Sequence, residues 1–252
     1  MFNGLISKSY IVDNITIFIP HKIIDVKKLI LISHGSGGIG EAEKHTAKFF
    51  IEQGYKVGII DYFHPYNIKK LWWNYEEKFL DLHDTTFDNM LRLTHSFNEE
   101  IIHIGFSLGG FYGIQNSEKF LLNFCFYPGI FCFTNNHVEK DYSNTVVFTA
   151  DQDNWCDNYQ SFSSLCKMPP SEIKIKNAHH GFMIPNKCKQ VTIAKYKFPI
   201  SPISMEDFKR LKPNHFYLTE KFGYIPADIW LKYDEESCIM SLRHIKDRIK
   251  SL

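Results

Sequence analysis

Short strand-like runs alternate with helix-like segments along most of this 252-residue chain. Continuous apolar runs such as residues 29–33 are typical of strands that are buried on both faces of a sheet. Strand-like segments occupy residues 29–33, 56–61, 101–106, 121–127, 145–150 and 172–176. Helical segments are expected at 41–53, 81–97 and 235–252. This order predicts an α/β fold with a mostly parallel central sheet and helices on both faces.

The length of the chain suits one domain with a full core, so we expect a single domain over 1–252. Alternating isoleucines in residues 14–20 predict an opening antiparallel hairpin. Residues 185–233, rich in proline and aromatics, fit the alternation poorly and are interpreted as an elaboration. The closing helix is expected at about 235–252. Its apolar face consists of Cys238, Leu242, Ile245, Ile249 and Leu252.

The overall charge argues against a polyanionic partner. The net charge at pH 7 is +1, and basic and acidic residues are mixed along the chain. The sequence therefore predicts neither a nucleic-acid nor a membrane partner, and residues 1–20 resemble neither a signal peptide nor a membrane span. The six cysteines lack metal-site spacing. Because scattered reduced thiols are typical of intracellular proteins, we expect a cytoplasmic location.

The segment Gly105-Phe106-Ser107-Leu108-Gly109 lies between a predicted strand and a predicted helix. G-x-S-x-G in this context makes a sharp turn that lifts the serine hydroxyl above the carboxyl edge of the sheet. The two glycines leave room for a strained backbone. The motif predicts Ser107 as a nucleophile, with the amide of Leu108 directed into the site. The alternative is an ordinary glycine-rich turn that begins a helix.

A serine nucleophile needs a base, and the base needs an acid that orients it. His180 follows the last predicted strand of the sheet, and acidic residues follow the strand before it. Because carboxyl ends of parallel strands meet at one edge, we expect these residues near Ser107, in the chain order that such a site requires. His180 would take the serine proton. The candidates for the acid are Asp151, Asp153 and Asp157.

The second amide of an oxyanion hole is expected after the first buried strand, in the segment 34–38. Small residues there allow backbone N–H groups to approach a developing oxyanion. Ser36 is the expected donor with Gly37 as the reserve, and His34 is interpreted as structural. Several aromatic residues are candidate walls of a substrate pocket, although each could equally be a core residue. They are Phe63, Trp72, Trp73, Trp155 and Phe182.

Taken in order, these motifs resemble those of the dienelactone hydrolase family of α/β-hydrolases. The shared segments span nearly the whole chain: 33–38, 61–63, 105–110, 127–129, 153–155, 180–182 and 233–234. At matching positions the resemblance implies a triad of Ser107, Asp153 and His180. It further implies cleavage of a small ester or lactone through an acyl-enzyme, with no metal or organic cofactor. Dienelactone hydrolase itself has a cysteine nucleophile, so the serine leaves the substrate open.

Residues 35–40 also match the dinucleotide fingerprint G-x-G-x-x-G, and Asp61 stands roughly twenty residues further on, where a ribose-binding acid would lie. An NAD(P)-dependent short-chain dehydrogenase is therefore the main alternative. It would need Tyr-x-x-x-Lys on a mid-chain helix, and the match at 217–221 is late and in a proline-rich context. It also leaves the predicted triad unexplained. A catalytically inactive binding protein with the same fold is a third class.

Overall fold

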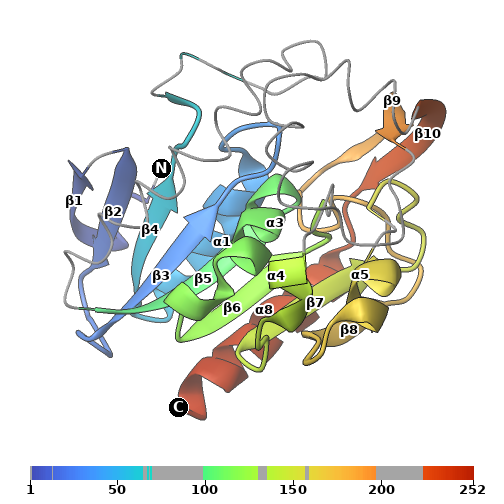
Figure 1. Cartoon of the computed structure of the whole chain (residues 1–252). Coiled ribbons are helices and arrows are strands. Elements are labelled where there is room, and N and C mark those ends of the chain that lie inside the picture. Colours follow the sequence, from blue (N-terminus) through green and yellow to red (C-terminus); the bar gives the residue numbers. More distant parts are fainter. Residues whose placement is uncertain are drawn as a thin grey trace.

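The computed structural model describes residues 2–12, 14–64, 67, 69, 99–129, 135–156, 159–196 and 224–252. An eight-stranded sheet lies at its centre, in the order β1-β2-β4-β3-β5-β6-β7-β8 (Figure 1). Its strands are β1 (Ile6–Val12), β2 (Ile15–Pro20), β3 (Lys28–Ser33), β4 (Lys56–Ile60), β5 (Glu100–Phe106), β6 (Leu122–Phe126), β7 (Thr145–Ala150) and β8 (Ser171–Ile175).

The strand directions confirm a mostly parallel sheet. The opening hairpin is antiparallel, as predicted, and β2 also pairs antiparallel with β4. All strands from β4 across to β8 run parallel to their neighbours. The carboxyl ends of six strands therefore meet at one edge, where the residues that follow them can form a common site.

Helices cover both faces of the sheet (Figure 1). One face packs against α1 (Glu41–Glu52) and α8 (Glu235–Lys250), through side chains such as Ile30 and Ile32 of β3. The opposite face packs against α3 (Leu108–Gln115), α4 (Asn135–Glu139) and α5 (Tyr159–Leu165), through the alternate side chains Leu29 and Leu31. The alternation of side chains along a buried strand explains why residues 29–32 of β3 are all apolar. A short 3-10 helix, η3 (Ser117–Lys119), follows α3. The predicted helix at 81–97 lies outside the described residues.

Between β8 and the closing helix, the chain forms a second, two-stranded sheet. β9 (Cys188–Tyr196) and β10 (Tyr224–Lys232) pair antiparallel inside the predicted elaboration. Asp234 is the N-cap of α8, and its side chain accepts a hydrogen bond from Ser237 N at 2.8 Å. Its predicted apolar face is buried except for Leu252, which is 57% exposed because the helix already ends at Lys250. The assignment of 1–252 to a single domain stays a prediction.

The strand order differs from that of a dinucleotide-binding fold. In that fold the third parallel strand lies outside the second, so that the order reads 3-2-1-4-5-6. Here β5 pairs with β3, and the antiparallel strand β2 covers the outer edge of β4. The residue proposed for ribose binding, Asp61, instead accepts hydrogen bonds from Phe63 N and His64 N at 3.1 and 3.0 Å. The dehydrogenase alternative is therefore not favoured.

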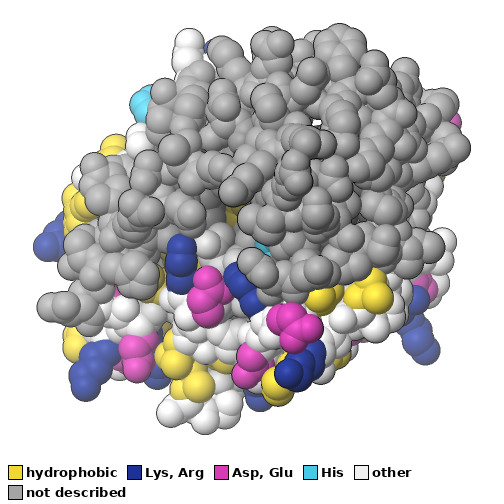
Figure 2. All heavy atoms as spheres, in the orientation of Figure 1, with side chains coloured by type: hydrophobic (Ala, Val, Ile, Leu, Met, Phe, Trp, Pro, Cys, Tyr) yellow, Lys and Arg dark blue, Asp and Glu magenta, His cyan; other side chains and the backbone are white. Residues whose placement is uncertain are grey.

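The described part of the surface shows no separation of charge in the view of Figure 2, where basic and acidic side chains are interspersed. Among the helices that the structure describes, none is both long and apolar enough to cross a membrane.

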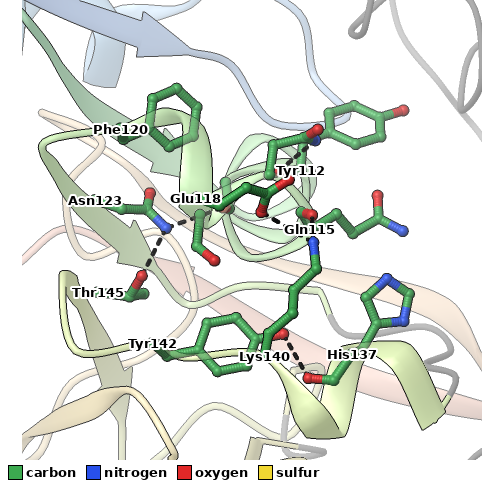
Figure 3. Close-up of polar contacts among 12 residues, drawn as sticks. Tyr112, Gln115, Glu118, Phe120, Asn123, His137, Lys140, Tyr142 and Thr145 are labelled. Carbon is green, nitrogen blue, oxygen red and sulfur yellow. Dashed lines mark hydrogen bonds and ion pairs between the residues drawn. The ribbon is translucent and has the colours of Figure 1, made fainter.

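A buried polar network joins four strands beneath α3. The ring of His103 on β5 bonds Ser33 Oγ through Nε2 at 2.7 Å and Asn123 Oδ1 through Nδ1 at 2.8 Å. Asn123 in turn donates to Gly113 O at 2.9 Å and to Thr145 Oγ1 at 3.2 Å (Figure 3). Each ring nitrogen has a partner when the ring is neutral, with the proton on Nδ1. The network thus satisfies polar groups that would be costly to bury alone.

This network predicts an acid-sensitive fold. Burial, partly opposed by the hydrogen bond to Asn123, lowers the pKa of His103 from 6.5 to about 4. Between these values the unfolded chain binds a proton that the folded chain does not, so stability present above about pH 6.5 is lost as the pH falls toward 4. From pH 7 to pH 5 we expect this residue to lower the free energy of unfolding by about 2 kcal/mol, measured by guanidinium titration.

The His103→Gln variant should lose this part of the pH dependence, whatever its stability at pH 7. The matched control is His137→Gln, because burial also lowers the pKa of His137 to about 4, and this variant should retain the contribution of His103. An unchanged pH dependence in His103→Gln would contradict the prediction.

Candidate active site

Ser107 occupies a strained turn between β5 and α3. Its φ of 50° and ψ of −107° are a rare combination for a residue with a side chain. The turn is held by two neighbouring segments, because Ser107 N donates to Phe126 O at 2.9 Å and Gly129 N donates to Ser107 O at 3.2 Å. Ser107 is 8% exposed. Strain that persists because surrounding bonds enforce it is a feature of functional sites.

The glycines of the motif are required by close backbone contacts. A Cβ atom on Gly105 would lie 2.4 Å from Gly109 O, and one on Gly109 would lie 2.5 Å from Ser33 O. A Cβ atom on Gly35 would meet Ser107 Cβ at 3.4 Å. The loop after β3 therefore packs directly against the serine turn, and the glycines make this approach possible.

The loops after β7 and β8 bring Asp153 and His180 together. His180 Nδ1 lies 2.7 Å from Asp153 Oδ2, and the two residues are 4% and 8% exposed. The other oxygen, Oδ1, accepts hydrogen bonds from Trp155 N at 2.9 Å and Cys156 N at 3.0 Å. The carboxylate is thus fixed by its own loop and directed at the histidine.

The surroundings of Asp153 favour its ionised form. Burial alone raises the pKa of this carboxyl, but the charge and hydrogen bond of His180, with the amides of Cys156 and Trp155, outweigh burial and lower the pKa below 3.8. Of the other two candidate acids, Asp151 is exposed at the end of β7, and Asp157 lies outside the described residues. The aspartate that the structure places against the His180 ring is therefore Asp153.

Within the described part of the chain, no hydrogen bond joins the Ser107 hydroxyl to the His180 ring. Such bonds are often long in unliganded enzymes and shorten when substrate binds. The two residues follow β5 and β8, whose carboxyl ends share one edge of the sheet.

The elaboration predicted at 185–233 contributes directly to this arrangement. The amide of Lys232 on β10 donates to His180 O at 3.3 Å, and Asn154 Nδ2 donates to Asp228 O at 3.0 Å. β10 therefore connects the loop that carries the acid to the loop that carries the histidine. No sequence pattern indicates this role, because both contacts join segments that are distant along the chain.

Two aromatic rings lie against the His180 ring, each with its centroid at 4.6 Å. They belong to Trp155 and to Tyr127, which follows β6 with a φ of 36°. Trp155 is a predicted pocket residue, whereas the sequence analysis includes Tyr127 only in the shared segment 127–129. Its position at the end of a parallel strand was the signal that could have assigned it to the site.

Two other predicted pocket residues, Phe63 and Phe182, do not pack against this ring. Phe182 is fully buried in the core cluster on the α1 and α8 face. Phe63 is 1% exposed and packs edge-on against His34. Both occupy core positions, because apolar rings next to strand ends are drawn into the packing beneath the site. Trp72 and Trp73 lie outside the described residues.

The loop after β3 presents backbone groups beside the serine turn. A tight turn closes it, with Gly38 N donating to Gly35 O at 3.1 Å, and Ser36 lies at its centre. Leu108 is the first residue of α3, so its amide has no acceptor within the helix. The ring of His34 is buried and stacked on Tyr62 at 3.8 Å, which agrees with a structural role.

Two further residues near the site were not identified from the sequence. Glu43 of α1 is buried, and its Oε2 accepts a hydrogen bond from Gly40 N at 2.8 Å, which fixes the end of the 34–40 loop. Burial raises the pKa of this carboxyl. Cys156 is half-buried, and one ligand atom from each of Asp153, Cys156 and His180 lies within 4.8 Å of the others.

Comparison with known proteins supports the fold. No protein-family model and no curated protein sequence matches the chain. An alpha-beta serine hydrolase homologue from Coxiella burnetii matches in structure with a TM-score of 0.54 and 16% identity, over 71% of this chain and 91% of the other.

Two further structures agree with this match. A serine hydrolase without lid from Xanthomonas campestris has a TM-score of 0.51 and 12% identity, over 73% of this chain and 88% of its own. A proposed dienelactone hydrolase from Klebsiella pneumoniae has a TM-score of 0.50 and 11% identity, over 71% and 89%. The chain therefore has the α/β-hydrolase fold, as predicted. Membership of the dienelactone hydrolase family stays a prediction.

Proposed function

We propose that this protein is a serine hydrolase that cleaves a small carboxylic ester or lactone through an acyl-enzyme. The observation that carries the proposal is the strained turn at Ser107 on the same sheet edge as the buried His180–Asp153 pair. A nucleophile, a base and an orienting acid after three parallel strands are the parts that acyl transfer to water requires.

In the first half of the reaction, Ser107 Oγ attacks the carbonyl carbon of the ester while His180 Nε2 accepts the hydroxyl proton. The C=O bond opens to a tetrahedral oxyanion. When it re-forms, the bond to the leaving alcohol breaks, and His180 returns the proton to that oxygen. In the second half, water loses its proton to His180 and attacks the acyl-enzyme, and Ser107 is released with the proton back on its oxygen.

Asp153 has two functions in this scheme. Its hydrogen bond keeps the proton of neutral His180 on Nδ1, so that Nε2 is available as the base. Its negative charge then stabilises the imidazolium that forms when Ser107 is deprotonated. The lowered pKa of Asp153 supports this function, because the carboxylate stays charged over the working pH range.

The oxyanion would be bound by the backbone amides of Leu108 and Ser36. Leu108 N lies at the N-terminus of α3, where the helix dipole also favours negative charge. Ser36 lies in the loop that packs against the serine turn through Gly35. These groups and the triad carry every step, so the proposed reaction requires no metal and no organic cofactor. The proposed partner is a small-molecule substrate, and the cytoplasmic location rests on the cysteine pattern alone.

Labelling with a fluorophosphonate probe tests the function. The probe should bind covalently to Ser107, identified by peptide mapping, because only an activated serine attacks the phosphorus rapidly. The Ser107→Ala variant should not be labelled. Absence of labelling in the folded wild type, or labelling at another residue, would contradict the proposal.

A panel of nitrophenyl esters tests the substrate class. The resemblance to dienelactone hydrolases points to small acyl groups, so kcat/KM should be highest for short chains and fall as the chain lengthens. Lys69 is exposed, and its backbone oxygen would lie 2.7 Å from a Cβ atom on Gly38, in the loop after β3. A terminal carboxylate on the acyl group should therefore raise kcat/KM in the wild type more than in Lys69→Ala. A maximum of kcat/KM at long acyl chains would contradict the small-substrate proposal. If the terminal carboxylate changed kcat/KM equally in the wild type and in Lys69→Ala, Lys69 would not bind that carboxylate.

A further inference from the structure

Three side chains with metal-binding atoms meet at the end of β7 and β8. One ligand atom from each of Asp153, Cys156 and His180 lies within 4.8 Å of the other two. The described residues form no other group of this kind. Two of its members are buried and the third, Cys156, is half-buried, so the group is enclosed by protein rather than spread over the surface.

The three residues are already held together. Asp153 Oδ2 contacts His180 Nδ1 at 2.7 Å, and Asp153 Oδ1 accepts the amide of Cys156 at 3.0 Å. The carboxylate thus fixes both the ring and the backbone that carries the thiol. Donors that are held in place before an ion arrives lose little conformational entropy when they bind it.

The kinds of donor select the kind of ion. One imidazole, one thiolate and one carboxylate are ligands that Zn²⁺ and related thiophilic cations accept, with a fourth position left for water. Mg²⁺ and Ca²⁺ prefer oxygen alone. Ligands around a tetrahedral zinc ion are about 3.3–3.8 Å apart, so the Asp153–His180 contact would open slightly and the thiol would approach. Side-chain rotations can supply both movements.

We propose that Asp153, Cys156 and His180 form a binding site for a thiophilic divalent cation, and that the bound ion switches the hydrolase off. The second part rests on the proposed function, whereas the first part does not. The ring nitrogen assigned to the ion is His180 Nδ1, because it already faces the carboxylate.

Inhibition follows from the two tautomers of the ring. In the ion-free site the neutral ring carries its proton on Nδ1 and offers Nε2 as a base. An ion on Nδ1 requires the lone pair of that nitrogen, so the proton of the neutral ring moves to Nε2 through solvent. Nε2 can then no longer accept the proton of Ser107. Cys156 binds as thiolate and releases its proton, so binding liberates one proton in total.

Titration with Co²⁺ tests the site without reference to activity. Thiolate bound to Co²⁺ gives a charge-transfer absorption in the near ultraviolet. We expect this band at one equivalent in the wild type and in Ser107→Ala, and its loss in Cys156→Ser, with at least about tenfold weaker binding. The matched control is Cys188→Ser, which replaces an exposed cysteine and should keep the band.

Inhibition by Zn²⁺ tests the regulatory part. Each variant is compared with its own rate of nitrophenyl acetate hydrolysis in EDTA. The wild type and Cys188→Ser should be inhibited at the same Zn²⁺ concentration, reversibly by EDTA, and Cys156→Ser should need at least about ten times more.

The outcomes separate the two proposals. Failure of the wild type to bind one equivalent of Co²⁺, or a band that persists in Cys156→Ser, would overturn the metal site. A metal site in a protein that hydrolyses no ester would leave the site intact and overturn the proposed function. Stoichiometric binding without inhibition of an active enzyme would overturn the switch.

Discussion

Replacement of Ser107 by alanine should lower kcat for nitrophenyl acetate by on the order of 10³-fold or more, because members of a triad act as a unit and loss of the nucleophile removes the covalent route. The protein should remain folded, since the main-chain bonds that hold the turn, from Ser107 N to Phe126 O and from Gly129 N to Ser107 O, do not involve the hydroxyl.

Two measurements make this result interpretable. The circular dichroism and thermal unfolding of Ser107→Ala should match those of the wild type, which excludes loss of activity through unfolding. The control variant is Ser164→Ala, which removes an exposed hydroxyl from α5 and should retain the wild-type rate. Full turnover by a pure Ser107→Ala preparation would end the serine hydrolase proposal.

Replacement of Asp153 by asparagine should lower kcat by about 10⁴-fold with little change in packing. The amide has nearly the shape of the carboxylate, but it carries no charge and its NH₂ group can donate to Nδ1. His180 would then hold its proton on Nε2 and could not act as the base. The KM should change much less than kcat, because Asp153 is proposed to contact only the histidine and its own loop.

Asp151→Asn is the matched control for this variant. Asp151 stands two residues earlier on the same loop, its side chain is exposed, and the hydrogen bond from Asp151 N to Ile175 O does not involve the side chain. Its kcat should remain within about twofold of the wild type. If Asp151→Asn lost activity while Asp153→Asn kept it, the acid would be Asp151, and the pairing of Asp153 with His180 would be structural.

Some features of the protein follow from local sequence alone. The predicted bounds of strands β3 to β8 and of helices α1 and α8 agree with the structure to within two residues, because buried strands need apolar runs and α1 needs an end signal such as Gly54, whose φ is +84°. The strained turn at Ser107 could also be predicted. Its glycines are required by contacts between residues four positions apart, such as Gly105 with Gly109, so the motif encodes its own geometry.

The choice among chemically similar residues needed the tertiary structure. Asp151, Asp153 and Asp157 follow the same strand, and in the sequence only the family resemblance favours Asp153. The docking of the loops after β7 and β8 turns the Asp153 carboxylate toward His180. Likewise, the sequence predicts Phe182 and Trp155 as pocket residues on equal grounds. In the structure Phe182 is fully buried in the core, whereas Trp155 lies against the His180 ring.

The sequence alone predicts the order of the strands along the chain, the edge of the sheet where the candidate site lies, and the residue types available there. It could not determine contacts between segments far apart in the chain. The Ser33–His103–Asn123–Thr145 network joins four strands, and the loops of Asp153 and His180 are connected by β10. Such contacts depend on how separate elements pack, and a hydrogen bond across the fold leaves no periodic pattern in either of the segments that make it.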